Sequence, residues 1–186
     1  MSINKLEDSI GYLSGPIDDA EDNGIQWRRQ LVELLKEKKM GFIKILDPTN
    51  KLPGLCEEVG DTQEIMKSHK LHQRWDALTA MMRPVVRVDL RQVDVCDFLI
   101  AYIDVDIHAC GTYHEIVIAN QQKKPILIIS KQGKKSVPSW LFGILDHDCF
   151  LESVEECVDY LSGINDGGVP ANDKWVLFRH QLNKIG

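Results

Sequence analysis

Short apolar runs alternate with longer amphipathic stretches from one end of the sequence to the other. The apolar runs that have the length of β-strands are 9–13, 42–46, 98–103 and 125–129. The run at 98–103 is continuously apolar, which is typical of a strand covered on both faces. Strands that alternate with helices indicate crossover connections. We therefore predict a three-layer α/β fold, flavodoxin-like or Rossmann-like, whose mainly parallel sheet has five strands, these four runs among them, and helices on both faces.

The amphipathic stretches predict the helices. Apolar residues at helical spacing favour helices at 24–39, 61–82, 85–95, 111–122, 139–145 and 151–161, with a last amphipathic segment at 173–182. Pro84 suits the first turn of the helix from residue 85, because the missing N–H costs nothing there. We expect a single domain over 1–186, with a motif-bearing core at about 9–145 and a C-terminal helical segment at about 151–184.

Length and charge narrow the function classes. The chain has 186 residues, enough for one well-buried domain and too few for two ordinary ones. Asp and Glu number 28 against 22 Lys and Arg, and the formal net charge is −6, which argues against binding to polymeric nucleic acid. The chain has no apolar run of signal-peptide or membrane-spanning length. We expect a cytoplasmic protein that does not bind membranes.

The cysteines predict neither a disulfide framework nor a metal site. There are five, widely spaced and without a C-x-x-C pair: Cys56, Cys96, Cys110, Cys149 and Cys157. His108, Cys110 and His114 lie close in sequence, but a second ligand pair at the spacing of a zinc site is missing. We therefore expect reduced, mostly buried thiols and no bound metal.

Polar residues directly after the strands are the first candidates for chemistry, because open parallel sheets bind ligands at the carboxyl ends of their strands. At the end of the first strand, Tyr12 and Ser14 precede Gly15, which permits a tight turn and close approach of the backbone to a ligand. An ordinary Ser-Gly-Pro turn is the alternative interpretation of this segment.

The loop and helix after the third strand form a second candidate. Gly111 and Thr112 open a helix whose free N–H groups can hold an anion or a hydroxyl, and Glu115 lies one turn further. Glu115 can point into the strand-end crevice or simply complement the helix dipole. Asp104 and Asp106 are paired carboxylates of the kind that binds Mg²⁺, but no phosphate-binding glycine-rich loop accompanies them.

The helix at 85–95 supplies a third candidate. Asp89 shares its helical face with apolar residues, so it projects from a largely apolar surface. A carboxyl in such a place can have a raised pKa and donate a proton near neutral pH. A salt bridge from Asp89 to a neighbouring arginine is the alternative.

Taken together, these three candidate segments give the chain a sequence that resembles the nucleoside 2-deoxyribosyltransferase family over about residues 9–145. The motifs that carry the resemblance are Tyr12-Leu13-Ser14-Gly15, Asp89-Leu90 before the strand Asp97–Tyr102, Gly111-Thr112-Tyr113-His114-Glu115, Ala119, and Lys124-Pro125. The resemblance implies that Glu115 is the nucleophile, that the Tyr12 hydroxyl orients it, and that Asp89 protonates or holds the base.

The resemblance also implies the substrate contacts. The residues expected to bind substrate are Ser14, Gly15, Pro16, Ile17, Asp47, Asp104, Asp106, Gly111, Thr112 and Ser139. Ser139, with Ser136 as the competing match, would contact the 5′ end of the sugar across a subunit interface. The family's transferase branch carries an acid six residues before the catalytic Glu, where this chain has Ala109. Asp104 or Asp106 would substitute for it.

The implied activity is 2-deoxyribosyl transfer between nucleobases through a covalent glycosyl-Glu115 intermediate, in a homo-oligomer with shared active sites and without a cofactor. The partners would be a nucleoside or nucleoside 5′-monophosphate and a nucleobase. Hydrolysis of nucleoside 5′-monophosphates is the first alternative, as in the related N-glycosidase branch. A non-catalytic nucleotide-binding or sensor domain is another. A magnesium-dependent phosphotransfer enzyme using Asp104 and Asp106 is the third.

Overall fold

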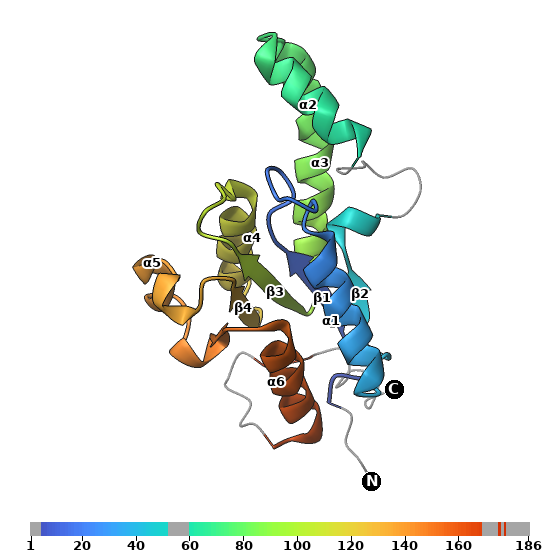
Figure 1. The fold of residues 1–186 in the computed structure, drawn as a ribbon. Helices are drawn as coiled ribbons and strands as arrows, with labels where there is room; N and C mark the ends of the chain where they lie inside the picture. The colour runs from blue at the N-terminus through green and yellow to red at the C-terminus, as the bar shows by residue number, and fades with distance from the viewer. Residues whose placement is uncertain (1–4, 52–59, 169–174, 176, 178–186) are drawn as a thin grey trace.

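The computed structural model describes residues 5–51, 60–168, 175 and 177 (Figure 1). Five strands form one sheet in the order β2-β1-β3-β4-β5, and every pair of neighbours is parallel. The strands are β1 Ile10–Ser14, β2 Lys44–Leu46, β3 Phe98–Ile103, β4 Ile126–Ser130 and β5 Phe150–Leu151. The predicted α/β class with a parallel five-stranded sheet is confirmed. None of the described helices combines the length and the apolar character needed to cross a membrane.

Helices cover both faces of the sheet, which gives three layers (Figure 1). On one face, Leu13 and Ile100 pack with α1 (Ile25–Glu37) and α6 (Val154–Asp166) in one buried cluster. On the other face, Tyr12 and Leu99 pack in a second buried cluster. This cluster also contains Val93 of α3 (Trp75–Val95) and residues of α4 (Cys110–Gln121) and α5 (Ser139–Phe142). Because successive side chains of a strand point to opposite faces, the same strands contribute residues to both clusters.

The predicted helices at 61–82 and 85–95 have the wrong boundaries. The structure has α2 at Asp61–Leu71, and α3 begins at Trp75 and continues past Pro84 to Val95. Gln73 takes a left-handed conformation, with φ 54°, and ends the first helix. Pro84 removes only the hydrogen bond to the Ala80 carbonyl, and both residues are exposed, so water can bind that carbonyl.

The α2–α3 hairpin extends beyond the sheet (Figure 1). Its apolar residues do not all reach the core as the helical spacing suggests: Leu71 is 78% exposed and Trp75 56%. The sequence pattern therefore predicts these helices but not which of their apolar residues are buried.

The region after β4 also departs from the prediction. The helix expected at 151–161 begins three residues later, because Phe150 and Leu151 form the edge strand β5. Ser153 caps α6 by accepting a hydrogen bond from the backbone N–H of Glu156 at 3.1 Å. The short helix expected at 139–145 ends at Phe142. The segment expected at 173–182 lies almost wholly outside the described residues, as does Cys56.

Candidate active site

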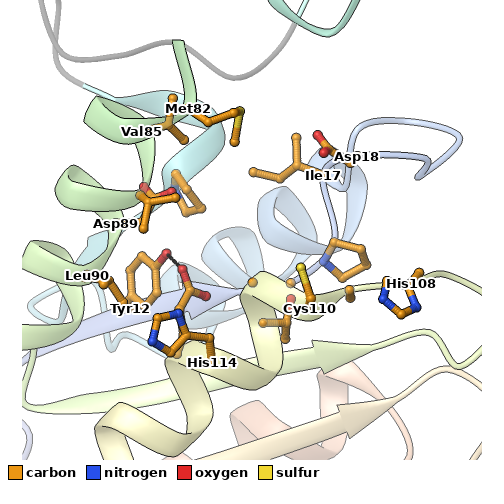
Figure 2. A pocket seen from close by; sticks show the side chains of 18 residues that line it. Tyr12, Ile17, Asp18, Met82, Val85, Asp89, Leu90, His108, Cys110 and His114 are labelled. Atoms are coloured by element: carbon orange, nitrogen blue, oxygen red, sulfur yellow. Dashed lines mark hydrogen bonds between the residues drawn. The ribbon is translucent and has the colours of Figure 1, made fainter. Parts of the chain in front are cut away.

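A cavity of about 210 Å³ opens at the carboxyl end of β1, between the start of α4 and the middle of α3 (Figure 2). Side chains from separate parts of the chain line it: Tyr12, Gly15, Pro16, Ile17, Asp18, Pro48, Met82, Val85, Val86, Asp89, Leu90, His108, Ala109, Cys110, Gly111, Thr112, His114 and Glu115. All three residues predicted to be catalytic are among them. The parallel sheet brings them together, because β1 and β3 end at the same edge.

Glu115 lies in the second turn of α4 and is buried at the bottom of this cavity. The Tyr12 hydroxyl donates a hydrogen bond to Glu115 Oε1 at 2.8 Å, drawn as the dashed line in Figure 2. The Ser14 hydroxyl donates to Glu115 Oε2. Both donors come from β1, where Tyr12 and Ser14 share one face because strand side chains alternate.

The pKa of Glu115 is raised to about 7. Burial is the main cause, because it penalises the charged form. The hydrogen bonds from Ser14 and Tyr12 lower the pKa, the negative charge of Asp89 raises it, and Arg28 lowers it. The side chain is thus close to its midpoint near neutral pH, where a carboxylate that is poorly solvated is available as a nucleophile.

Asp89 lines the cavity from α3, next to Val85 and Leu90 (Figure 2). Its Oδ1 lies 2.7 Å from the Nζ atom of Lys51. The sequence analysis considered a salt bridge with a neighbouring arginine, but the partner is a lysine that follows the 3₁₀ helix η1 (Pro48–Asn50). Nothing in the local pattern pointed to Lys51, because the ion pair joins segments almost forty positions apart.

Arg28 of α1 holds the loop that follows β1. Its guanidinium donates to the carbonyl oxygens of Gly15 at 3.0 Å and Gly24 at 2.7 Å, and the residue is fully buried. Gly15 has no room for a side chain, since a Cβ would lie 2.9 Å from Cζ2 of Trp27. The predicted site segment Gly15–Ile17 therefore lines the cavity, held by a buried arginine that sequence reasoning did not identify.

The start of α4 forms the opposite wall. Gly111 and Thr112 line the cavity as predicted, and Ala109 occupies the N-cap position without a side-chain cap. His108, Cys110 and His114 also line the cavity, although the sequence analysis considered them only as metal ligands. Within the described part of the chain, no three His, Cys, Asp or Glu side chains form a group suited to a metal ion.

No family model matches the chain, and no curated protein does. Among solved structures, a 2-deoxyribosyltransferase from the psychrotolerant bacterium Bacillus psychrosaccharolyticus is similar, with a TM-score of 0.55 and 16% identity over 82% of this chain and 92% of that one. A conserved protein from Enterococcus faecalis V583 has a TM-score of 0.42 and 16% identity over 84% and 87%.

The chain shares its fold with a 2-deoxyribosyltransferase. At 16% identity this likeness concerns the fold alone. It agrees with the resemblance drawn from the sequence motifs at the level of the fold.

Two of the predicted substrate-binding residues, Asp104 and Asp106, do not line this cavity. Asp104 accepts hydrogen bonds from Lys131 Nζ and Gln132 Nε2, each at 2.6 Å, and Asp106 accepts one from Gln132 at 3.0 Å. Burial raises the pKa of Asp104, but these hydrogen bonds outweigh it and the pKa lies below its usual value. Asp104 lines a neighbouring cavity instead. Neither carboxylate lines the cavity beside Ala109.

Asp47 and Ser139 also lie outside the cavity. Asp47 caps η1 by accepting hydrogen bonds from the Thr49 N–H at 2.8 Å and the Thr49 hydroxyl at 2.7 Å, which gives it a structural role. Ser139 is exposed at the first position of α5. The contact predicted for Ser139 involves a second subunit and stays a prediction.

Proposed function

We propose that this protein cleaves the N-glycosidic bond of a 2-deoxynucleoside and transfers the 2-deoxyribosyl group to another nucleobase through a covalent ester with Glu115. The observation that carries the proposal is the buried Glu115 carboxyl, held by hydroxyl donors on both oxygens and facing a cavity that Asp89 shares. The fold likeness to a 2-deoxyribosyltransferase supports it.

In the first half-reaction the bond between C1′ and the base nitrogen breaks, and its electron pair leaves with the base. Positive charge develops at C1′ and the ring oxygen, and the Glu115 carboxylate below the ring stabilises it and then bonds to C1′. The leaving base takes up one proton from the solvent and is held by a hydrogen bond to the Asp89 carboxylate at the cavity wall. A missing 2′-hydroxyl makes this cation easier to form.

In the second half-reaction a nitrogen of the incoming base attacks C1′ and loses one proton. The ester bond breaks, and its electrons return to Glu115 as a carboxylate. Two inversions give retention at C1′. If water attacks instead, the products are the free sugar and the base, so that transfer and hydrolysis differ only in the acceptor.

Tyr12 and Ser14 orient the nucleophile. Each donates to a different oxygen of Glu115, which fixes the plane of the carboxylate. The same hydrogen bonds stabilise the charged form against the effect of burial. An unesterified, ionised Glu115 is therefore available near neutral pH.

The charges around the cavity favour a nucleoside over a nucleoside 5′-monophosphate. Asp18, Asp89 and Glu115 line it, whereas Lys131, a cation on the loop after β4, does not line it and pairs with Asp104 at 2.6 Å. The Ser14 hydroxyl donates to Glu115. A neutral sugar avoids adding two negative charges to this site.

The product profile tests the proposal. The protein would be incubated with 2-deoxynucleosides or their 5′-monophosphates, each with a second base, and the products separated by chromatography, with Glu115→Gln as the matched control. We expect exchanged nucleoside from the wild type and none from the variant. Base and sugar phosphate from the monophosphates alone would replace the proposal with the hydrolase. Binding without turnover in any mixture would contradict an enzyme and favour a sensor domain.

A further inference from the structure

Lys51 and Asp89 form an ion pair at the wall of the candidate active site. The distance from Lys51 Nζ to Asp89 Oδ1 is 2.7 Å, and the two side chains are 1% and 12% exposed. An ammonium group removed from water in this way is costly unless a nearby anion compensates for the lost hydration. The pair therefore differs from a solvated surface salt bridge, and each partner fixes the position of the other.

Asp89, one member of the pair, also contributes to the charge that Glu115 experiences. The negative charge of Asp89 raises the pKa of Glu115, and Lys51 lies directly against that charge. The other titratable or charged groups facing Glu115 are Tyr12 of β1, Arg28 of α1, Asp18 of the following loop, and His108, Cys110 and His114 at the start of α4. Removing Lys51 alone would leave the Asp89 charge uncompensated beside a carboxylate that is already destabilised by burial.

We propose that Lys51 is a positioning residue, which holds the Asp89 carboxylate at the cavity wall as a hydrogen-bond acceptor for the base and offsets its charge toward Glu115. The role in base binding rests on the proposed function, whereas the effect on Glu115 does not. Lys51 acts through Asp89, since it is absent from the cavity-lining residues while Asp89 is among them.

A purely structural ion pair would stabilise the fold without changing how Glu115 titrates. The two roles can be separated by a set of four variants: Lys51→Met, Lys51→Arg, Asp89→Asn, and the double variant Lys51→Met with Asp89→Asn. Glutamate labelled with ¹³C at Cδ would be incorporated, and the Glu115 resonance identified by its loss in Glu115→Gln. Its titration midpoint would then be measured by NMR without any substrate.

We expect the midpoint to rise by about one pH unit in Lys51→Met, the size of effect a nearby charge has on a buried carboxyl. It should stay close to the wild-type value in Lys51→Arg and in the double variant, where the charge is retained or both charges are removed. An unchanged midpoint in Lys51→Met would overturn the proposal, as would an equal rise in the double variant.

If Lys51→Met does not fold, Asp89→Asn decides the question, because it removes the Asp89 charge and retains the Lys51 charge, which should lower the Glu115 midpoint below that of the wild type. No change in that variant would also overturn the proposal. In kinetic measurements at a pH where Glu115 is ionised, Lys51→Met should raise KM for the nucleoside several-fold with a smaller effect on kcat, and Lys51→Arg should restore it. A wild-type protein without any turnover would refute the proposed function but leave the titration result intact.

Discussion

Two opposing influences act on the Glu115 carboxyl. Burial raises its pKa, and hydrogen bonds from Ser14 and Tyr12 lower it, so that the pKa settles at about 7 rather than higher. The reactive, ionised form therefore becomes populated as the pH rises through neutrality. Any change that weakens the hydrogen bonds from these two hydroxyls should raise the pKa of Glu115 further.

Tyr12→Phe tests this balance. Removing the hydroxyl deletes the 2.8 Å hydrogen bond to Oε1, so the pKa of Glu115 should rise further. We expect the acidic limb of the kcat/KM profile to move to higher pH, with a loss of about tenfold or more at pH 6 and a smaller loss at pH 9. Tyr113→Phe, on the adjoining helix, is the control. An acidic limb at the wild-type pH would show that Tyr12 does not support the charged form.

The same buried carboxyl should reduce the stability of the protein at high pH. An unfolded Glu loses its proton near pH 4.5, whereas Glu115 in the folded state keeps it until about pH 7. Between these values the folded state binds more protons, so the free energy of unfolding falls as the pH rises. The full effect, present above pH 7, is up to about 3 kcal/mol.

Glu115→Gln should therefore be more stable than the wild type at pH 8 and nearly equal to it at pH 4. Glutamine has the same shape and does not titrate, so the variant removes the penalty for the buried charge. Urea denaturation at both pH values measures the difference. A variant less stable than the wild type at pH 8 would contradict the raised pKa.

Among the individual residues of the site, the sequence predicted Glu115, Tyr12 and Asp89, and the structure places all three at one cavity. They could be predicted because each lies in or near a strand whose position the apolar pattern reveals, and because the family resemblance implies their roles. Lys51 was not accessible, because no periodicity links a residue after β2 to a side chain on α3. Asp104 and Asp106 were plausible by position, but the sequence does not reveal that Lys131 and Gln132 bind them.

Among the elements, α1 and the loop after β1 depend on Arg28. Arg28→Leu should remove the side-chain hydrogen bonds to the Gly15 and Gly24 carbonyls. We expect a loss of about 3 kcal/mol in the free energy of unfolding and weaker substrate binding, because Gly15 and Pro16 line the cavity. Arg29→Leu, one residue further and exposed, is the matched control. Equal effects of the two substitutions would contradict the role of Arg28.

Element boundaries show what local patterns leave undetermined. Strands β1, β3 and β4 lie within one residue of their predicted ends, because continuous apolar runs define them. The division between α2 and α3 was wrong, because Pro84 was interpreted as a helix start and the left-handed Gln73 has no sequence signal of its own. The two-residue strand β5 is too short for any periodicity to predict.

For the molecule as a whole, the acidic charge and the cavity volume of about 210 Å³ predict a small ligand. The net charge is −6, and three carboxyl groups line the cavity. Binding to the folded state alone raises the melting temperature. We expect a 2-deoxynucleoside at millimolar concentration to raise the Tm by a few degrees and a single-stranded oligonucleotide at equal nucleotide concentration to leave it unchanged. A shift with the oligonucleotide alone would contradict this choice of ligand.

The central claim is that Glu115 forms a covalent bond to the sugar. Rapid acid quenching of the protein with a 2-deoxynucleoside, without an acceptor base, followed by mass spectrometry of the intact chain and its peptides, tests it most directly. We predict a mass increase of one 2-deoxyribosyl group, located on the peptide that contains Glu115 and absent from Glu115→Gln. Base release by the wild type without an adduct at any quench time, or an adduct that persists in Glu115→Gln, would contradict the claim.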